Sequence, residues 1–239
     1  MNTTMSEIVQ KMKSSGRYRS ITDQEYARLK LEQSAKLAAQ EAANYRPDYS
    51  RLGITEAESS LTWDAVRPDI SDGLKAVQTV RPMYERGFGI VFLWGTYGQA
   101  KTLIGKILTA TAFRDGKRAA YANLSDALDN IRLAFDEKEH KTTELLRRMD
   151  WWIERDVLFL DELDKANGTE WALSTIFTLL DRRYQRAIRE EALTVIASNK
   201  STDTLDGYLK SRLHDRRIGN VVYLNGPDAR KVMPEGYKF

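Results

Sequence analysis

Five short apolar runs, separated by longer stretches, constrain the fold of this chain more than any other feature. They occupy residues 90–94 (IVFLW), 118–124 (RAAYANL), 156–162 (DVLFLDE), 192–199 (ALTVIASN) and 220–225 (NVVYLN). Continuous apolar runs of this length predict strands that are buried on both faces, as in a parallel sheet covered by helices. Residues 101–113 follow the first run with apolar residues at helical spacing. We therefore expect an α/β fold that binds ligands at the carboxyl ends of its strands.

Composition excludes several classes of site. The chain has no cysteine, which excludes disulfides, thiolate zinc sites and cysteine catalysis, and its only histidines are His140 and His214. No apolar run approaches the roughly 20 residues of a membrane span, and the first residues lack the apolar segment of a signal peptide. The net charge of +3 permits nucleic-acid binding without indicating it. We expect a cytoplasmic protein that binds no membrane.

Residues 1–60 differ from the rest of the chain, because they are polar and helix-prone. A helix is expected within residues 22–43, where Thr22 precedes Gln24 and Glu25 at a helix start. Its apolar stripe is thin, so it should dock either on its own domain or on a partner protein. The residues from Pro47 onwards read as a linker. We expect a helical partner-binding region and linker at residues 1–60 and a second domain at residues 61–239.

Residues 93–106, LWGTYGQAKTLIGK, read as a phosphate-binding loop in which one glycine is replaced. The pattern G-x-x-x-x-G-K-[ST] follows a strand and opens a helix. Backbone N–H groups of such a loop surround phosphate oxygens, Lys101 would contact the β- and γ-phosphates, and Thr102 would bind Mg²⁺. The expected ATP-binding residues are Gly95, Thr96, Tyr97, Gly98, Gln99, Ala100, Lys101 and Thr102.

Ala100, which stands where the pattern has its second glycine, leaves two interpretations open. Glycine lets the backbone approach the phosphates because it has no Cβ, so an added methyl could crowd the β-phosphate. Gly98, two residues earlier, would relieve part of the strain in the loop. The loop either retains ATP binding or has become nucleotide-dead. The other motif residues are intact, and this favours retained function.

Two acids and an asparagine come at the ends of the third and fourth apolar runs. Asp161 and Glu162 follow VLFL, and Asn199 follows TVIAS. At these strand ends Asp161 would hold Mg²⁺ and Glu162 would polarise the attacking water, which is the Walker B pattern of hydrolytic P-loop ATPases. Asn199 would position water near the γ-phosphate. The alternatives are that the acids cap the next helix and that Asn199 is a turn residue. The ordered set favours the active-site interpretation.

Together these motifs resemble the AAA+ ATPases of the DnaC/DnaI/IstB group, which are bacterial and phage helicase loaders and their transposition relatives. The resemblance covers roughly residues 61–225 and rests on WDAVRPDISDGLKAVQ, GTYGQAKT, VLFLDELDK, TLLDRRYQRA, TVIASNK and SRLHDRR. It implies a P-loop NTPase fold of the AAA+ ASCE type. About 14 residues follow the fifth run, which is too short for the C-terminal helical lid of most AAA+ proteins; loaders of this group often lack that lid. Sensor 2 has no clear candidate.

The resemblance also implies roles for single residues. Lys101 and Thr102 match Walker A, Asp161 and Glu162 match Walker B, and Asn199 matches sensor 1. Arg212 matches the arginine finger offered to the ATP of a neighbouring subunit, so that self-association would complete the site. Arg216 is the alternative finger, and a solvated basic helix face is the other interpretation of SRLHDRR.

The function implied by the resemblance is ATP-dependent loading of the replicative DNA helicase onto single-stranded DNA, with Mg²⁺-dependent ATP hydrolysis that is weak and stimulated by assembly or DNA. Residues 1–60 would bind the helicase. A transposition helper ATPase of the IstB kind and a nucleotide-dead adaptor are the alternatives, and a small-molecule P-loop kinase is disfavoured by Glu162 and the Arg212 cluster.

The expected DNA contacts lie between the second and third apolar runs. Phe135 could stack on a base, although Phe135 and Trp151 are also good core residues. The candidate phosphate contacts are Arg132, Lys138, Lys141, Arg147 and Arg148.

Overall fold

The computed structural model describes residues 28, 30–36, 48–67, 71–137, 140–165 and 168–232. The chain forms two compact units, Met1–Pro47 and Asp48–Phe239. In the first unit, residues 30–36 are helical and an exposed Arg28–Glu32 ion pair joins successive turns at 3.0 Å. This agrees with part of the helix expected within residues 22–43. The rest of that segment lies outside the described residues.

The second unit begins earlier than the expected boundary after residue 60. The short helices α3 (Tyr49–Leu52) and η1 (Ala57–Ser60), which were expected in the linker, belong to it. Ile54 between them is buried in the core, and the Tyr49 ring packs edge-on against Phe113 at 5.8 Å. The guanidinium of Arg114 donates to the carbonyls of Ser59 and Leu61. These apolar and hydrogen-bonded anchors hold a mostly polar segment on the domain.

The five expected strands are confirmed, and they form one parallel sheet in the order β2-β3-β4-β1-β5. Their bounds are β1 (Gly89–Gly95), β2 (Ala119–Asn123), β3 (Val157–Asp161), β4 (Leu193–Ser198) and β5 (Gly219–Leu224). Every residue of β3 and β4 is buried, as a strand covered on both faces should be. The carboxyl ends of the central strands therefore open at one edge of the sheet.

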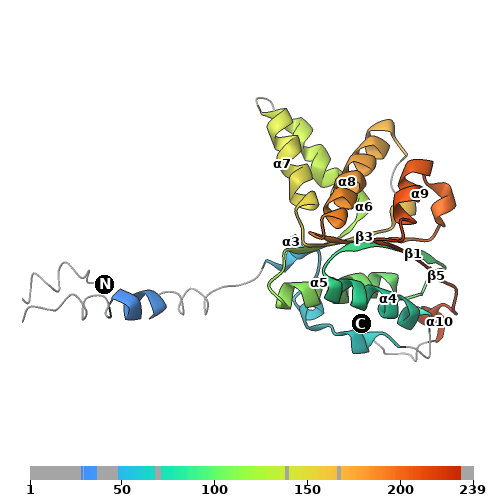
Figure 1. Cartoon of the computed structure of the whole chain (residues 1–239), viewed down its shortest axis with the longest axis horizontal. Helices are drawn as coiled ribbons and strands as arrows, with labels where there is room; N and C mark the ends of the chain where they lie inside the picture. Colours follow the sequence, from blue (N-terminus) through green and yellow to red (C-terminus); the bar gives the residue numbers. More distant parts are fainter. Residues whose placement is uncertain are drawn as a thin grey trace, which may run out of the picture. The chain divides into compact units, whose positions relative to one another are not determined.

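Helices cover both faces of the sheet. Figure 1 shows α4 and α5 on one face and α6, α7, α8 and α9 on the other. The α-helices are α4 (Gly73–Arg86), α5 (Lys101–Arg114), α6 (Leu124–Arg132), α7 (Lys141–Ile153), α8 (Glu170–Ile188), α9 (Gly207–Leu213) and α10 (Ala229–Val232), and the further 3-10 turns are η2 (Trp63–Ala65), η3 (Leu133–Asp136), η4 (Leu163–Lys165) and η5 (Thr202–Thr204). After β5, the described residues form only α10. The expected absence of a C-terminal helical lid also concerns residues 233–239, which lie outside the described residues.

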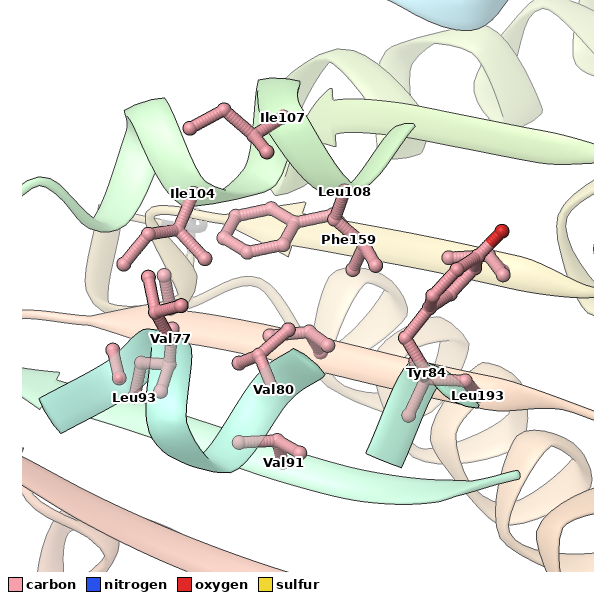
Figure 2. Packing of buried hydrophobic residues seen from close by; sticks show 14 of the residues in the cluster. Val77, Val80, Tyr84, Val91, Leu93, Ile104, Ile107, Leu108, Phe159 and Leu193 are labelled. Carbon is pink, nitrogen blue, oxygen red and sulfur yellow. The ribbon is translucent and has the colours of Figure 1, made fainter. Parts of the chain in front are cut away.

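Two hydrophobic clusters hold the layers together, one on each face of the sheet. Figure 2 shows the first, in which Val77 and Val80 of α4 and Ile104 of α5 meet Val91 and other sheet residues. Each fully buried aliphatic side chain stabilises the fold by about 1.5–3 kcal/mol relative to exposure. The second cluster packs α6, α7, α8 and α9 on the opposite face. The strand ends that carry the site are thus fixed from both sides.

Arg183 is the largest fully buried side chain among the described residues, and it ties α8 to the sheet. Its guanidinium donates to Ile153 O at 2.8 Å, Leu193 O at 2.6 Å and Thr194 Oγ1 at 2.8 Å. A buried cation is tolerated when acceptors surround it in this way. These contacts lie at the start of β4, so they fix the sheet at the end opposite the site.

Candidate functional site

The carboxyl ends of β1, β3 and β4 converge on a cavity of about 260 Å³. Of the expected site residues, Tyr97, Gly98, Gln99, Ala100, Lys101, Thr102, Asp161, Glu162 and Asn199 all line it. The other two expected loop residues, Gly95 and Thr96, do not line it, and their carbonyls accept hydrogen bonds from Lys101. The fold therefore brings together one contiguous loop and two separate strand-end motifs, the acidic pair after β3 and Asn199 after β4.

Lys101 is buried beneath the loop that it closes. Its ammonium donates to Gly95 O and to Thr96 O, both at 2.8 Å. Burial lowers the pKa of Lys101, an effect that the nearby charges of Asp161 and Asp164 partly oppose. No side chain caps the first turn of α5, whose backbone N–H groups are the donors that a phosphate requires.

Ala100 has a left-handed backbone, with φ 58° and ψ 15°. Alanine in this conformation costs roughly 1–2 kcal/mol, whereas glycine adopts it freely. The two retained glycines are sterically required. A Cβ on Gly95 would lie 1.8 Å from Leu224 O, and one on Gly98 would lie 1.9 Å from Asp228 Oδ1. The departure from the motif thus falls where a methyl fits but strains the backbone.

Gln99, expected as an ATP-binding residue, also fastens the loop to two distant segments. Its side-chain amide accepts from the backbone N–H of Asp72 at 3.0 Å and of Gly226 at 3.1 Å. The same amide donates to Gly226 O at 2.7 Å and Pro227 O at 2.8 Å. It is almost completely buried, so all these bonds are shielded from water. The start of α4 and the segment after β5 are thereby joined to the phosphate loop.

Thr102 and Asp161 meet as expected of a pair that holds a metal ion. Thr102 Oγ1 donates to Asp161 Oδ2 at 2.7 Å, and the carboxylate is buried. Hard oxygen donors of this kind fit Mg²⁺, which takes its other ligands from water and phosphate. No group of three or more acidic, histidine or cysteine side chains suited to a metal occurs among the described residues. The residues present therefore fit a phosphate-linked Mg²⁺ and not an all-protein metal cage.

Glu162 and Asn199 are held by neighbouring side chains. Glu162 has a left-handed backbone, φ 57°, and its carboxylate pairs with Lys165 one turn later. The Asn199 amide donates to Asp164 Oδ2 at 3.2 Å, and its backbone N–H donates to Asp164 Oδ1 at 2.8 Å. Burial alone would raise the pKa of Asp164, but the hydrogen bonds from Asn199 outweigh it and lower that pKa. Asp164, a further acid of the LDELDK string, was missed in the sequence.

Arg212 does not line the cavity, and it is held by residues of its own chain. Its guanidinium lies 4.1 Å from the ring centroids of both Tyr184 and Tyr208 and pairs with Asp181 at 2.7 Å. Only 15% of its side chain is exposed. Arg216, the alternative finger, is exposed, and its side chain forms no hydrogen bond or ion pair with the described residues.

The candidate DNA contacts separate into two places. Arg132 lies 4.8 Å from the ring of Trp171, Lys141 lies 4.5 Å from that of Phe135, and the two rings meet edge-on at 5.6 Å. We call these four residues the aromatic–cation cluster. The second place is a cavity of about 490 Å³ at the end of β2, which Arg147, Arg148 and Trp151 help to line. Lys138 lies outside the described residues.

Four further residues carried no clear sequence signal: Glu58, Lys106 and Arg230 line the cavity at the phosphate loop, and Tyr121 contacts Asp161 beside it. Glu58 pairs with Lys106 across the cavity wall, and Arg230 of α10 contributes another cation. Tyr121 of β2 donates from its hydroxyl to Asp161 Oδ2 at 3.0 Å. All four become visible only when the chain segments are placed in space. The tyrosine in particular reads as one more core residue in the run RAAYANL.

A family model described as ATPase family associated with various cellular activities (AAA) matches residues 91–220, which include the loop, the acidic pair and Asn199. The chain belongs to the AAA family. In this AAA protein the cavity at the carboxyl ends of the strands is lined by most of the residues expected to bind ATP. A search of curated protein sequences found no match.

Solved structures share the fold of this AAA protein at low sequence identity. A DnaC helicase loader is 18% identical with a TM-score of 0.53, over 71% of this chain and 99% of that one. A DnaI structure is 13% identical with a TM-score of 0.53, over 74% and 94%. AMPPCP-bound DnaA from Aquifex aeolicus is 21% identical with a TM-score of 0.50, and the match covers 64% of this chain but only 46% of DnaA. At these identities the likeness shows the fold.

Within the part of the AAA protein that the structure describes, none of the helices combines the length and apolar character needed to cross a bilayer.

Proposed function

We propose that this AAA protein is an ATP-dependent loader of the replicative DNA helicase onto single-stranded DNA. The observation that carries the proposal is the convergence of Lys101, Thr102, Asp161 and Asn199 on one cavity. The proposal is supported by the shared fold with a DnaC helicase loader, which is matched over nearly its whole length. Residues 1–60 are the proposed helicase-binding region, and the cell cytoplasm is the proposed location.

The proposed chemistry is in-line attack of water on the γ-phosphate of ATP, which breaks the bond to the β–γ bridging oxygen and releases ADP, inorganic phosphate and a proton from the water. The N–H groups at the start of α5 and the ammonium of Lys101 hold the phosphates. Thr102 and Asp161 hold Mg²⁺, which when bound neutralises charge that develops on the phosphates. The carboxylate of Glu162 breaks its ion pair with Lys165 and then orients and polarises the attacking water. Asn199 fixes the position of this water. An arginine from a neighbouring copy completes the site, so that turnover requires assembly.

A nucleotide-dead adaptor is the second candidate, because the backbone of Ala100 is in a conformation that favours glycine. Strain of about 1–2 kcal/mol is comparable with a tenfold change in affinity, so it weakens a nucleotide site without necessarily abolishing it. A transposition helper of the IstB kind would share the same ATP site and differ in its partner.

The test measures binding of a fluorescent ATP analogue and ATP turnover, with and without single-stranded DNA. The loader proposal expects micromolar binding that Lys101→Ala removes, and turnover that DNA stimulates and Glu162→Gln abolishes. Lys231→Ala serves as a control, because this exposed lysine on α10 does not line the cavity. An absence of nucleotide binding in the wild-type chain would support the adaptor. Capture of purified helicase, and not of transposase, would separate the loader from the transposition helper.

A further inference from the structure

The carboxylate of Asp161 accepts hydrogen bonds from three donors, two of them on other elements and one on the next residue. Oδ2 accepts from Thr102 Oγ1 of α5 at 2.7 Å and from the Tyr121 hydroxyl of β2 at 3.0 Å. Oδ1 accepts from the backbone N–H of Glu162 at 2.8 Å. An ionised carboxylate offers about four acceptor positions, so this arrangement leaves about one for a further donor. A metal-bound water is the donor that the proposed chemistry supplies.

Tyr121 reaches Asp161 because of the register between β2 and β3. Tyr121 is paired with Phe159, and Asn123 with Asp161. The tyrosine is therefore opposite the residue two positions before Asp161 and lies on the same face of the sheet as Asp161. Its ring stacks on Phe159 with centroids 5.6 Å apart, and it is buried. The hydroxyl also lies 3.3 Å from Asn123 Oδ1. Packing therefore fixes the ring, and the ring directs its hydroxyl to the metal-binding edge.

We infer that Tyr121 is a positioning residue, whose hydroxyl orients the Asp161 carboxylate for Mg²⁺. The inference rests on the proposed function, because Mg²⁺ enters this site with ATP. Thr102 is itself a proposed metal ligand, so its bond to Asp161 serves the metal as well as the carboxylate. Tyr121 does not line the cavity at the phosphate loop, and the packing of its ring on Phe159 holds its hydroxyl against Asp161. Loss of this hydroxyl leaves the carboxylate free to rotate and weakens the metal site.

The test compares Tyr121→Phe with Tyr84→Phe. Tyr84 is an equally apt control, because its hydroxyl also donates to a carboxylate, that of Asp115, from a buried ring of the same fold. Each change removes one hydroxyl and keeps the ring. The readout is binding of a fluorescent ATP analogue titrated with Mg²⁺, repeated with EDTA, and thermal unfolding confirms that both variants fold. For Tyr121→Phe we expect the half-saturating Mg²⁺ concentration to rise about tenfold, with binding in EDTA unchanged.

Three results would overturn the inference, and they differ in what they say about the proposed function. Equal Mg²⁺ requirements in Tyr121→Phe, Tyr84→Phe and the wild type would leave the proposed function intact and remove the role of Tyr121. Weaker binding of Tyr121→Phe in EDTA as well as in Mg²⁺ would show that the hydroxyl shapes the pocket instead of the metal site. A wild-type chain that binds no nucleotide would overturn both the inference and the proposed function.

Discussion

The guanidinium of Arg212 lies 2.7 Å from Asp181 of its own chain, between the rings of Tyr184 and Tyr208. This position gives the arginine a structural role within the second compact unit. Arg216, four residues later, is exposed to solvent. The two candidates for an arginine finger can therefore be separated by stability as well as by activity.

We expect Arg212→Ala to lower the free energy of unfolding by about 2 kcal/mol, because it removes a partly buried ion pair and two ring contacts. Arg216→Ala should leave stability within about 0.5 kcal/mol of wild type. If Arg216 is the finger, its removal lowers turnover about a thousandfold without weakening nucleotide binding. Urea unfolding and ATPase assays check both. Mixing Arg216→Ala with Lys101→Ala should restore turnover, because the first variant still binds ATP and the second still supplies the arginine. If the mixture stays inactive, and Arg212→Ala is stable but inactive, the finger is Arg212.

Ala100→Gly is expected to tighten nucleotide binding by up to about tenfold, because it removes left-handed strain that alanine carries in the loop. Its effect on stability should be small, since the gain is offset by the greater freedom of glycine in the unfolded chain. Gly98→Ala is the opposing control, because its methyl would overlap Asp228 Oδ1 at 1.9 Å. Titration with a fluorescent ATP analogue measures both. Unchanged affinity in Ala100→Gly would mean that the backbone strain at Ala100 does not weaken nucleotide binding.

Phe135→Ala is expected to weaken binding of single-stranded DNA about tenfold, which is within the range for one stacked base. Lys141→Ala should lower the salt dependence of binding by about 0.7 in the log–log slope, as expected for one lost phosphate contact. Arg189→Ala is the matched control, since this exposed arginine pairs with Glu191 at 2.9 Å away from the aromatic–cation cluster. Fluorescence anisotropy with a labelled oligonucleotide at several salt concentrations gives both values. Equal effects of all three changes would argue against a specific DNA surface there.

The Glu58–Lys106 pair predicts a pH-dependent stability. Burial alone would raise the pKa of Glu58, but the hydrogen bonds from Lys106 and Thr55 outweigh it, so the pKa lies below its ordinary value of 4.5. The pair therefore stabilises the fold fully above pH 4.5, and this stabilisation is lost as the pH falls through the lowered pKa. The difference in urea midpoint between wild type and Glu58→Gln should shrink from about pH 6 to about pH 3. Glu85→Gln, which alters an exposed helix pair with Arg81, should show little difference at any pH.

The strands could be predicted from the sequence because a parallel strand covered on both faces is apolar throughout. Val157 to Leu160 are all apolar and buried, so the segment shows no alternation of polar and apolar residues that would suggest a half-exposed strand. Most of the nucleotide site was equally accessible, since its residues follow directly from strand ends. The extent of the domain was not. Ile54 is the one buried residue in a mostly polar stretch, so residues 48–60 read as a linker although they pack on the domain.

The contacts that orient the site could not be predicted, because they depend on which strands and segments become neighbours. Tyr121 and Asp161 are 40 residues apart, and only the pairing of β2 with β3 brings them together. The same is true of Glu58 and Lys106, which are 48 residues apart. The strain at Ala100 was also hidden. Its identity was clear from the motif, but the left-handed backbone that makes glycine preferable belongs to the folded loop.

The hydrogen bonds of Gln99 join three chain segments into one mechanical unit. A single buried amide connects the loop with the backbone of Asp72 before α4 and with Gly226 and Pro227 after β5. A shift of the loop on phosphate binding must therefore displace both segments together or break bonds that water cannot replace. We therefore expect a change in nucleotide state to reach the segment before β1 and the segment after β5 through this one side chain.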